Sequence, residues 1–319
     1  MKNHRILITG GTGSLGTALA LRLIENNHIV VLSRNEERQF DLEQKLKLIN
    51  KKNYTFIIGR VEDENTLESA LVDCTTVIHT AAMKDLIYAE RNPYECILNN
   101  VLASQNLLKT LKRSSTVKIL CGISTDKAVA PSTIYGASKL AMESMFMDFA
   151  NRNPSIITSV ARFGNMIDSR GSLVTTWLRN PELLKGISHP ECSRFFFKID
   201  EAVNFILDTL STSETGTINV PLMKKIFIRD LVLKINRESA KNVLGLFPGE
   251  KISEKLVAVE EMAFTTLHND KFVINRNSIQ TNANRFSSGS LDSMDSATAS
   301  TFTSSEIDEL LMELASERT

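Results

Sequence analysis

Cysteine, proline and tryptophan are scarce in this chain, which has 4 Cys, 7 Pro and 1 Trp among 319 residues. The cysteines stand far apart and form no CxxC pair, so the sequence predicts reduced thiols rather than a disulfide framework or a zinc site. No apolar run approaches the roughly 18 residues that a membrane span needs. The short apolar run at the N-terminus leads directly into glycines, unlike a signal peptide. We therefore expect a cytoplasmic protein with no metal site and no membrane segment.

An excess of charge of either sign is also missing, because 37 Lys and Arg residues balance 37 Asp and Glu residues. A chain without a basic field is not expected to bind nucleic acid or an anionic membrane. An anionic ligand would have to be held by local groups. The hydrophobic share of 42% is that of an ordinary globular protein, which buries a core without disulfides.

What the chain does contain is a regular alternation of short apolar runs and helical segments over its first half. The expected strands are Arg5–Thr9, Ile29–Leu32, Tyr54–Ile58, Thr76–His79, Val117–Leu120 and Ile156–Arg162. The expected helices are Leu15–Asn26, Glu36–Ile49, Glu64–Leu71, Pro93–Leu111 and Ile134–Arg152. This alternation predicts an α/β fold with a doubly wound parallel sheet of the Rossmann type. Such sheets bind ligands outside the carboxyl ends of their strands.

The alternation stops after Phe163, which suggests a division of the chain. We expect residues 1–165 to form the dinucleotide-binding domain and residues 166–275 a smaller C-terminal substrate lobe interleaved with the core. Residues 276–319 should form a Ser/Thr-rich segment and a C-terminal helix. The segment is expected to follow the surface or to be mobile. The run from Ser305 predicts a capped amphipathic helix that docks on the protein.

Residues 9–16, TGGTGSLG, follow the first expected strand and open the first expected helix. Gly10 permits a tight turn, Gly13 lets the backbone approach a pyrophosphate and Gly16 lets the helix pack closely. The helix N-terminus offers N–H groups to the phosphates. The second strand ends in Ser33-Arg34 instead of an acidic residue, and a guanidinium pairs well with a 2′-phosphate. The sequence therefore favours NADP over NAD, the alternative being that Arg34 is a solvated charge.

Tyr135 and Lys139, in the run YGASK, share a face at the start of an expected helix. A nearby ammonium and the positive ring of a bound cofactor would favour the phenolate and make Tyr135 a base. Ser124-Thr125-Asp126-Lys127 ends another strand, and a hydroxyl of Ser124 or Thr125 would share the proton network. The alternative for Asp126-Lys127 is a surface salt bridge.

The glycine run and YxxxK together resemble the extended short-chain dehydrogenases/reductases over about residues 4–165. Further segments resemble the inverting UDP-N-acetylglucosamine 4,6-dehydratases of polysaccharide biosynthesis, up to about residue 270. These segments are SRNE (33–36), HTAAMKD (79–85), NPYECILNNV (92–101), STDKA (124–128), RFGN (162–165), SRGS (169–172) and PGEK (248–251). STDK is the most specific of them, because the related retaining dehydratases have Asp-Glu where this chain has Asp-Lys.

The resemblance implies a mechanism. Tyr135 takes the proton of the sugar's 4-hydroxyl, a neutral Lys127 removes the hydrogen on carbon 5, and a protonated Asp126 donates to the departing 6-hydroxyl. Reprotonation from the opposite face inverts carbon 5. Thr125 and Lys139 complete the catalytic set, and Lys84, Asn165 and Arg194 are expected near the sugar diphosphate. The expected cofactor-binding residues are Gly10, Thr12, Gly13, Ser14, Leu15, Gly16, Ser33, Arg34, Val61, Asp63, Ala81, Ala82, Asn100, Tyr135 and Lys139.

The family also tends to form homo-oligomers, for which Pro93–Leu111 is the expected contact face. Two positions depart from its pattern: Arg60 replaces an acidic residue near the adenine, and Phe247 replaces a basic residue before PGEK. Two other functions stay open. A UDP-sugar 4-epimerase would use Tyr135 and Lys139 without needing Asp126-Lys127. A non-catalytic NADP-binding protein of the same fold is the other, although such proteins commonly lose the tyrosine or the lysine.

Overall fold

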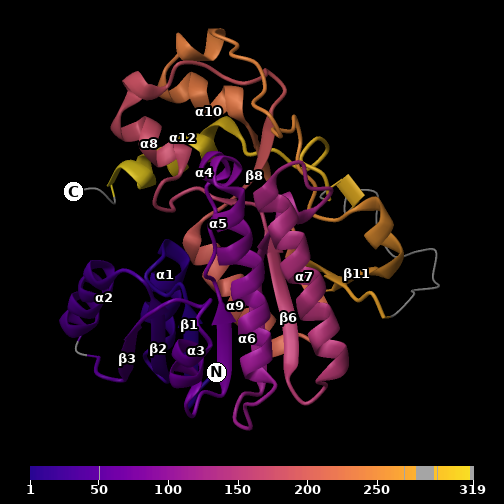
Figure 1. Cartoon of the computed structure of the whole chain (residues 1–319). Helices are drawn as coiled ribbons and strands as arrows, with labels where there is room; N and C mark the ends of the chain where they lie inside the picture. Colours follow the sequence, from indigo (N-terminus) through magenta and orange to yellow (C-terminus); the bar gives the residue numbers. More distant parts are fainter. Residues whose placement is uncertain (50, 269, 278–290, 293, 317–319) are drawn as a thin grey trace.

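The apolar runs of the sequence form a central sheet that the helices cover on both faces (Figure 1). The structure is a computed structural model that describes residues 1–49, 51–268, 270–277, 291–292 and 294–316. Within these residues the sheet has nine strands in the order β11-β12-β9-β6-β5-β4-β1-β2-β3. Their bounds are β1 Arg5–Thr9, β2 His28–Ser33, β3 Tyr54–Ile58, β4 Thr76–His79, β5 Ile119–Thr125, β6 Ile157–Phe163, β9 Thr217–Pro221, β11 Thr265–His268 and β12 Lys271–Ile274.

All pairings from β3 to β9 are parallel, which confirms the α/β prediction of a doubly wound sheet. The last two strands, β12 and β11, are antiparallel and were not predicted. They bring residues 265–274 back to the edge of the sheet after the chain has passed through the C-terminal lobe, so the two parts are interleaved.

Helices α7 and α9 both contact strands β5 and β6. They do so from opposite faces of the sheet (Figure 1). Helices α3, α6 and α7 are neighbours on one face, and α1 packs on α9 on the other (Figure 1). The bounds are α1 Ser14–Leu23, α2 Glu36–Leu48, α3 Glu64–Leu71, α4 Leu86–Arg91, α7 Ile134–Arg152 and α9 Ile199–Thr212. No helix in the described part of the chain is both long and apolar enough to cross a membrane. All four cysteines are buried and none is in a disulfide, as the sequence predicts.

The helix expected over Pro93–Leu111 is interrupted by a π-helical turn, η1 (Leu98–Leu102), between α5 (Pro93–Ile97) and α6 (Ala103–Leu111). A π turn inserts one residue into the helical repeat and occurs often at functional sites. Here it holds two consecutive buried asparagines, Asn99 and Asn100. Periodicity does not reveal such a turn, because the apolar residues on either side keep helical spacing.

The C-terminal lobe lies beyond the carboxyl ends of β5 and β6, at the top of Figure 1. A second sheet holds β7 (Asn165–Met166), β8 (Ser193–Phe197) and β10 (Lys225–Phe227), flanked by α8 (Leu173–Arg179) and α10 (Ile228–Ile235). The predicted C-terminal helix is confirmed as α12 (Ser304–Ser316). Its apolar face packs against the lobe and consists of Ile307, Leu310, Leu311 and Leu314. The short 3-10 helices are η2 Asp126–Ala128, η3 Pro181–Leu183, η4 Ser239–Lys241 and η5 Val259–Phe264.

The Ser/Thr-rich segment departs from the expectation that it follows the surface. Residues 278–290 and 293 lie outside the described residues, but Met294, Ser296 and Ala299 are buried. Ser296 Oγ lies 3.0 Å from Ser193 Oγ and accepts a hydrogen bond of 2.8 Å from the N–H of Glu254. The surface prediction was wrong for these residues because small side chains let the backbone around Ser296 pack against the segments that contain Ser193 and Glu254.

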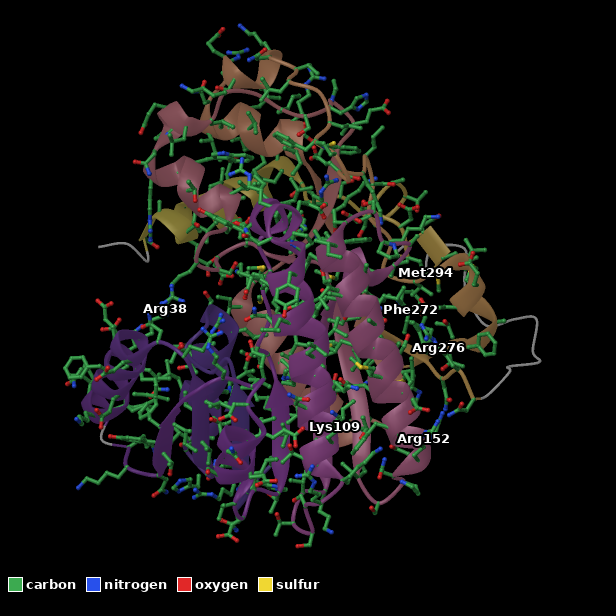
Figure 2. All side chains as sticks on the ribbon, viewed as in Figure 1. Arg38, Lys109, Arg152, Phe272, Arg276 and Met294 are labelled. Atoms are coloured by element: carbon green, nitrogen blue, oxygen red, sulfur yellow. The ribbon has the colours of Figure 1, made fainter. Side chains whose placement is uncertain are left out.

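Arg162, at the carboxyl end of β6, is fully buried and joins parts of the chain that are far apart in sequence. Its guanidinium donates to both carboxylate oxygens of Glu143 on α7, at 2.8 and 2.7 Å, and to both of Glu261 in η5, at 2.7 and 2.9 Å. It also donates to the carbonyl of Leu256 at 3.0 Å. Arg276, labelled in Figure 2, adds a 2.9 Å hydrogen bond to Glu261.

Burial alone would raise the pKa of Glu261, but its hydrogen bonds with Arg162 and the charge of that guanidinium outweigh burial. Together with the Ala258 N–H and Arg276 they lower this pKa from 4.5 to about 2. A carboxyl with a lowered folded-state pKa contributes stability above its unfolded value, and this stability is lost as the pH falls from about 4.5 towards 2.

Replacing Arg162 with Met should lower the free energy of unfolding by about 3–5 kcal/mol near neutral pH, because two carboxylates lose their buried partner. The measurement is urea unfolding followed by circular dichroism. The difference from wild type should narrow as the pH falls from 4.5 towards 2, the window set by Glu261. The control is Arg152→Met, which breaks the exposed i,i+4 pair with Asp148 at the end of α7 and should cost less than about 0.5 kcal/mol. Equal losses in both variants would contradict the prediction.

Candidate active site

The glycine-rich turn between β1 and α1 packs closely against the backbone that follows β4. Gly10 has a φ of 66°, and a Cβ there would lie 2.8 Å from the Cα of Ala81. A Cβ on Gly16 would lie 2.6 Å from the carbonyl oxygen of Gly10. Gly13 is the N-cap of α1 and offers no side chain to the first N–H groups of the helix. These features suit the close approach of a pyrophosphate.

A strap from the C-terminal lobe, residues 169–172 (SRGS), crosses this turn. The N–H of Arg170 donates to Ser14 Oγ at 2.9 Å, and its guanidinium lies 3.5 Å from the carbonyl of Thr12. From the other side, Lys84 Nζ donates to Ser169 Oγ and to the carbonyl of Arg170, both at 3.2 Å. Two cations therefore lie beside the glycine turn. The sequence marked the SRGS run but not Arg170 as a site residue.

Arg34 is exposed at the end of β2 and is held by the π turn. Its Nη1 donates to Asn99 Oδ1 at 2.7 Å, while Asn99 Nδ2 donates to the carbonyl of Glu95 at 2.7 Å. Because Asn99 is uncharged, this contact positions the guanidinium without neutralising it. Asn99 was missed by sequence reasoning, since only the π turn brings it to Arg34. Ser33 Oγ accepts a hydrogen bond from Gln39 at 3.0 Å.

The other expected cofactor residues lie at the carboxyl ends of neighbouring strands, and several have roles within the protein. The Asn100 side chain joins the backbone of Met83, at 2.7 and 3.0 Å, to Ser138 Oγ at 2.8 Å. The Asp63 carboxylate caps α3. Val61 and Leu15 are buried in the core, whereas Ala81 and Ala82 are partly exposed after β4.

Asp126, which is buried, and Lys127, which is partly buried, form a hydrogen-bonded ion pair at the end of β5. Asp126 is fully buried, and its Oδ1 accepts hydrogen bonds from Thr125 Oγ1 and Lys127 Nζ, both at 2.9 Å. Lys127 Nζ also donates to Asn165 Oδ1 at 2.9 Å. Asp126 Oδ2 and Ser124 Oγ are buried with no hydrogen-bond partner within the described residues. The alternative of a surface salt bridge is therefore wrong, and one carboxyl oxygen is left for a ligand.

Tyr135 begins α7 behind this pair and is buried. Burial raises its pKa above the ordinary value of 10, the negative charge of Asp126 adds to the rise, and a hydrogen bond with Thr125 opposes it. Lys139 contacts the sulfur of Met142 at 3.3 Å. Burial lowers the pKa of Lys139 to about 8, against the opposing charge of Glu143. That Lys139 and the positive ring of a bound cofactor together favour the Tyr135 phenolate stays a prediction.

The PGEK segment closes the site from the lobe. Arg194 is bonded to Glu250 at 3.1 Å and to the carbonyls of Ser193 and Ile252, at 2.8 and 3.2 Å, so these donors are used within the protein. Lys251 Nζ donates to the carbonyl of Val129 at 2.9 Å, just after η2. Phe247, in the place of a basic residue, is exposed.

Glu254 is a buried acid near the Asp126-Lys127 pair, which we call the dyad. Sequence reasoning missed Glu254. Its Oε2 lies 3.5 Å from Lys251 Nζ and has no hydrogen-bond partner in the parts of the chain that are described. Burial raises the pKa of Glu254, and the negative charge of Asp126 raises it further. The sequence signal that could have identified Glu254 is its position three residues after the PGEK run. Asp126, Lys127 and Glu254 thus form one electrostatic unit.

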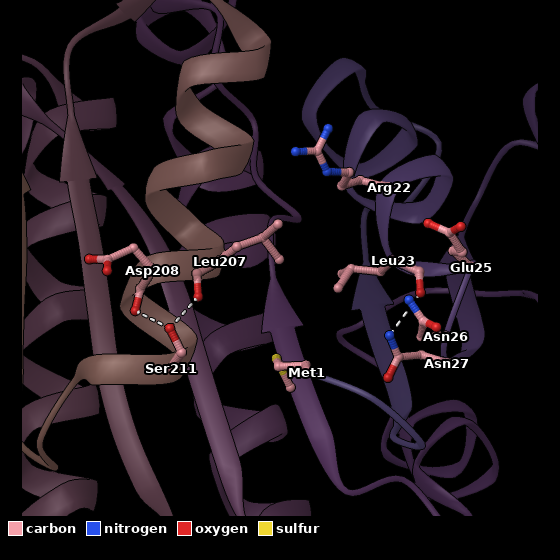
Figure 3. A pocket seen from close by; sticks show the side chains of 9 residues that line it. All are labelled: Met1, Arg22, Leu23, Glu25, Asn26, Asn27, Leu207, Asp208 and Ser211. Carbon is pink, nitrogen blue, oxygen red and sulfur yellow. Dashed lines mark hydrogen bonds between the residues drawn. The ribbon is translucent and has the colours of Figure 1, made fainter.

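A hollow of about 400 Å³ lies elsewhere, between α1 and α9 (Figure 3). It is lined by Met1, Arg22, Leu23, Glu25, Asn26, Asn27, Leu207, Asp208 and Ser211. Met1 precedes β1 and Asn27 precedes β2, so the hollow is at the amino ends of the strands. Ligands of this fold bind at the carboxyl ends, where the glycine turn and the dyad lie. We therefore assign the hollow no part in the site.

Comparison with known proteins places the chain in a family. The sequence pattern of the polysaccharide biosynthesis protein family matches residues 6–276. The chain belongs to this family. The inverting UDP-N-acetylglucosamine 4,6-dehydratase of Campylobacter jejuni is 33% identical over 270 residues, which cover 82% of this chain and 79% of that protein.

Other relatives carry a different activity in their names. A UDP-glucose 4-epimerase of Rickettsia bellii is 32% identical over 272 residues, covering 81% of this chain and 79% of that protein. Among solved structures, Pen from Bacillus thuringiensis superposes with a TM-score of 0.88 at 26% identity and covers 98% of both chains. The whole chain, lobe and C-terminal helix included, thus has a structural counterpart.

Replacing Lys139 with Met should raise the free energy of unfolding at pH 7 by up to about 3 kcal/mol, because the fold no longer holds a desolvated ammonium. The folded-state pKa of Lys139 is lowered from 10.5 to about 8, so wild-type stability should rise between pH 8 and 10.5, and the variant should lose this rise. Urea unfolding across this range measures both effects. Lys109→Met, on the exposed side of α6, is the control and should change stability by less than about 0.5 kcal/mol. A destabilised Lys139→Met protein would contradict the prediction.

Proposed function

We propose that this chain is an NADP-dependent UDP-N-acetylglucosamine 4,6-dehydratase that inverts carbon 5 of the sugar. The observation that carries the proposal is the buried Asp126-Lys127 pair beside Tyr135, with one carboxyl oxygen unpartnered among the described residues. Elimination of water needs an acid and a base on the sugar in addition to the tyrosine that serves oxidation. A sequence relative named as an inverting dehydratase, 33% identical over most of the chain, supports the same assignment.

The pair can supply acid and base without gaining or losing a proton. An ammonium beside a carboxylate and an amine beside a carboxylic acid contain the same number of protons, so transfer of one proton from Lys127 to the Asp126 carboxyl group interconverts them. The acid proton is placed on Oδ2, the oxygen that has no partner among the described residues. In the second form the Lys127 amine takes the hydrogen from carbon 5. The Asp126 carboxylic acid donates to the departing 6-hydroxyl, which leaves as water.

The residues at the carboxyl ends of the strands fit a bound dinucleotide. Gly10 and Gly16 let the turn and α1 pack tightly against neighbouring backbone, so the N–H groups at the start of α1 can face the pyrophosphate. The exposed Arg34 follows β2, where the adenosine ribose binds in this fold. When bound, NADP⁺ would accept the hydride from carbon 4 and return it to carbon 6 after water has left, and its nicotinamide ring would bring a positive charge to Tyr135. Such a charge is required because the protein's own groups raise the pKa of Tyr135. Tyr135 then takes the proton of the sugar's 4-hydroxyl.

The remaining assignments are part of the proposal. Lys84 and Arg194 are placed near the sugar diphosphate, although Arg194 must exchange part of its contact with Glu250 for the ligand. The chain is proposed to act in the cytoplasm and to form a homo-oligomer through Pro93–Leu111. Exposed Tyr94 and Leu102 on that segment support a contact there.

Lys127→Ala and Asp126→Asn should each lower kcat for the 4-keto-6-deoxy product by about 10²–10⁴-fold, because each removes one proton-transfer group. Both variants should still reduce bound nicotinamide on mixing with UDP-N-acetylglucosamine, since oxidation at carbon 4 depends on Tyr135. Stopped-flow absorbance of the reduced nicotinamide and proton NMR of the product measure the two steps.

The same experiment separates the competing functions. Turnover unchanged in both variants, with a 4-epimer as product, would establish the epimerase named among the relatives. No reduced nicotinamide and no product in the wild type would leave a binding protein. Ring couplings of the product decide the stereochemistry, and retained configuration at carbon 5 would contradict inversion.

Arg34→Ser should weaken NADP⁺ binding at least about tenfold and leave NAD⁺ binding within about threefold, because only NADP⁺ carries the 2′-phosphate that the guanidinium pairs with. Isothermal titration calorimetry with both cofactors measures the difference. The control is Arg38→Ser, an exposed arginine in the following helix α2 (Figure 2), which should change neither affinity. Equal weakening of both cofactors by Arg34→Ser would argue against a phosphate contact.

A further inference from the structure

Asn165 lies where the chain leaves the central sheet for the lobe, on the short strand β7 that pairs with β8. Its Oδ1 accepts the hydrogen bond from Lys127 Nζ at 2.9 Å, and its Nδ2 donates to the carbonyl of Phe195 at 3.2 Å. Lysine can only donate and a backbone carbonyl can only accept, so these two partners determine which way the amide faces. The amide oxygen is therefore directed at Lys127.

The surrounding backbone holds this amide close to β8. A Cβ on Gly164 would lie 2.5 Å from the Cβ of Phe195, so the preceding glycine permits the approach that Asn165 needs. Phe195 is fully buried. The asparagine is thus attached to a rigid part of the lobe, whereas Lys127 belongs to the loop after β5. Their hydrogen bond joins the base to the lobe that would cover the sugar.

The number of hydrogen-bond acceptors around Lys127 Nζ determines whether the lone pair of a neutral amine has a fixed direction. A neutral amine has two N–H bonds and one lone pair in a roughly tetrahedral arrangement. With the acid proton of Asp126 on Oδ2, the oxygen that has no partner among the described residues, two acceptors face Nζ: Asp126 Oδ1 and Asn165 Oδ1, each at 2.9 Å. If both N–H bonds are used in this way, the direction of the lone pair is determined. With one acceptor alone, the second N–H bond and the lone pair could exchange positions.

We propose that Asn165 is the positioning residue of Lys127: its amide oxygen aims the lone pair of the amine at the hydrogen on carbon 5. This inference rests on the proposed dehydratase function and changes the expected role of Asn165, which the sequence assigned to the sugar diphosphate. A phosphate contact would act on substrate affinity. A positioning contact acts on the removal of the carbon-5 hydrogen and leaves affinity and carbon-4 oxidation largely intact.

The choice of an amide is part of the inference. An Asp at this position would present a second carboxylate to Lys127 and stabilise its ammonium form, which is not a base. Asn165→Asp preserves the shape of the side chain and reverses its electrostatic effect, whereas Asn165→Ala removes the acceptor. The two variants therefore test position and charge separately.

The test uses the cofactor-loaded full-length protein with UDP-N-acetylglucosamine in deuterated buffer. Proton NMR and mass spectrometry of the recovered sugar nucleotide report deuterium at carbon 5, and absorbance reports reduced nicotinamide. Asn165→Ala should slow exchange at carbon 5 by about 10- to 100-fold, with KM and the rate of nicotinamide reduction within about threefold of wild type. Asn165→Asp should slow exchange at least as much, with its pH optimum shifted upward. Thermal unfolding checks that both variants are folded.

A comparison variant defines the behaviour of a phosphate contact. Lys84→Gln should raise KM with little effect on exchange at saturating substrate. If Asn165→Ala behaves like Lys84→Gln, or exchanges like the wild type, the inference is overturned while the dehydratase function stands. If the wild type itself exchanges no hydrogen at carbon 5, the proposed function fails, and the inference fails with it.

Discussion

The site depends on the buried guanidinium of Arg162. It holds α7 through Glu143, one turn beyond Lys139, and it holds the lobe through the carbonyl of Leu256 and the carboxylate of Glu261. Three residues further along the chain, on β7, is Asn165, which contacts Lys127. One charged side chain thus fixes the distance between the helix of the tyrosine, the segment of Glu254 and the strand that reaches the dyad. Desolvating these charges is costly, but it holds the proposed catalytic groups on a single rigid framework.

The chemistry of the proposed site depends on which of its side chains carry protons. Burial lowers the pKa of Lys139 and raises that of Tyr135, so each is pushed towards its uncharged form. Asp126 and Lys127 are held close enough to exchange a proton, with Glu254 beside them.

The sequence predicted the parts of this arrangement that depend on local order. The alternation of strands and helices, the glycine turn and the strand-end position of Thr125, Asp126 and Lys127 follow from spacing and residue type. It could not predict contacts made by distant segments. The π turn that brings Asn99 to Arg34 leaves no trace in the periodicity, and Glu254 reaches the dyad only through the packing of the lobe. The burial of Ser296 was contrary to composition, since a run of small polar residues resembles a surface linker until backbone partners are known.

The tight packing of Ser296 against Ser193 and Glu254 also affects the order in which parts of the protein fold during synthesis. Residues of the parallel sheet up to β6 emerge from the ribosome early and can pair in order as they appear. The wall of the proposed site formed by Ser193 and Glu254 lacks its inner support until Ser296 has been synthesised, long after β6. The parallel strands can therefore pair before the backbone around Glu254 reaches its final position, and the proposed active site is completed later than the sheet that carries it.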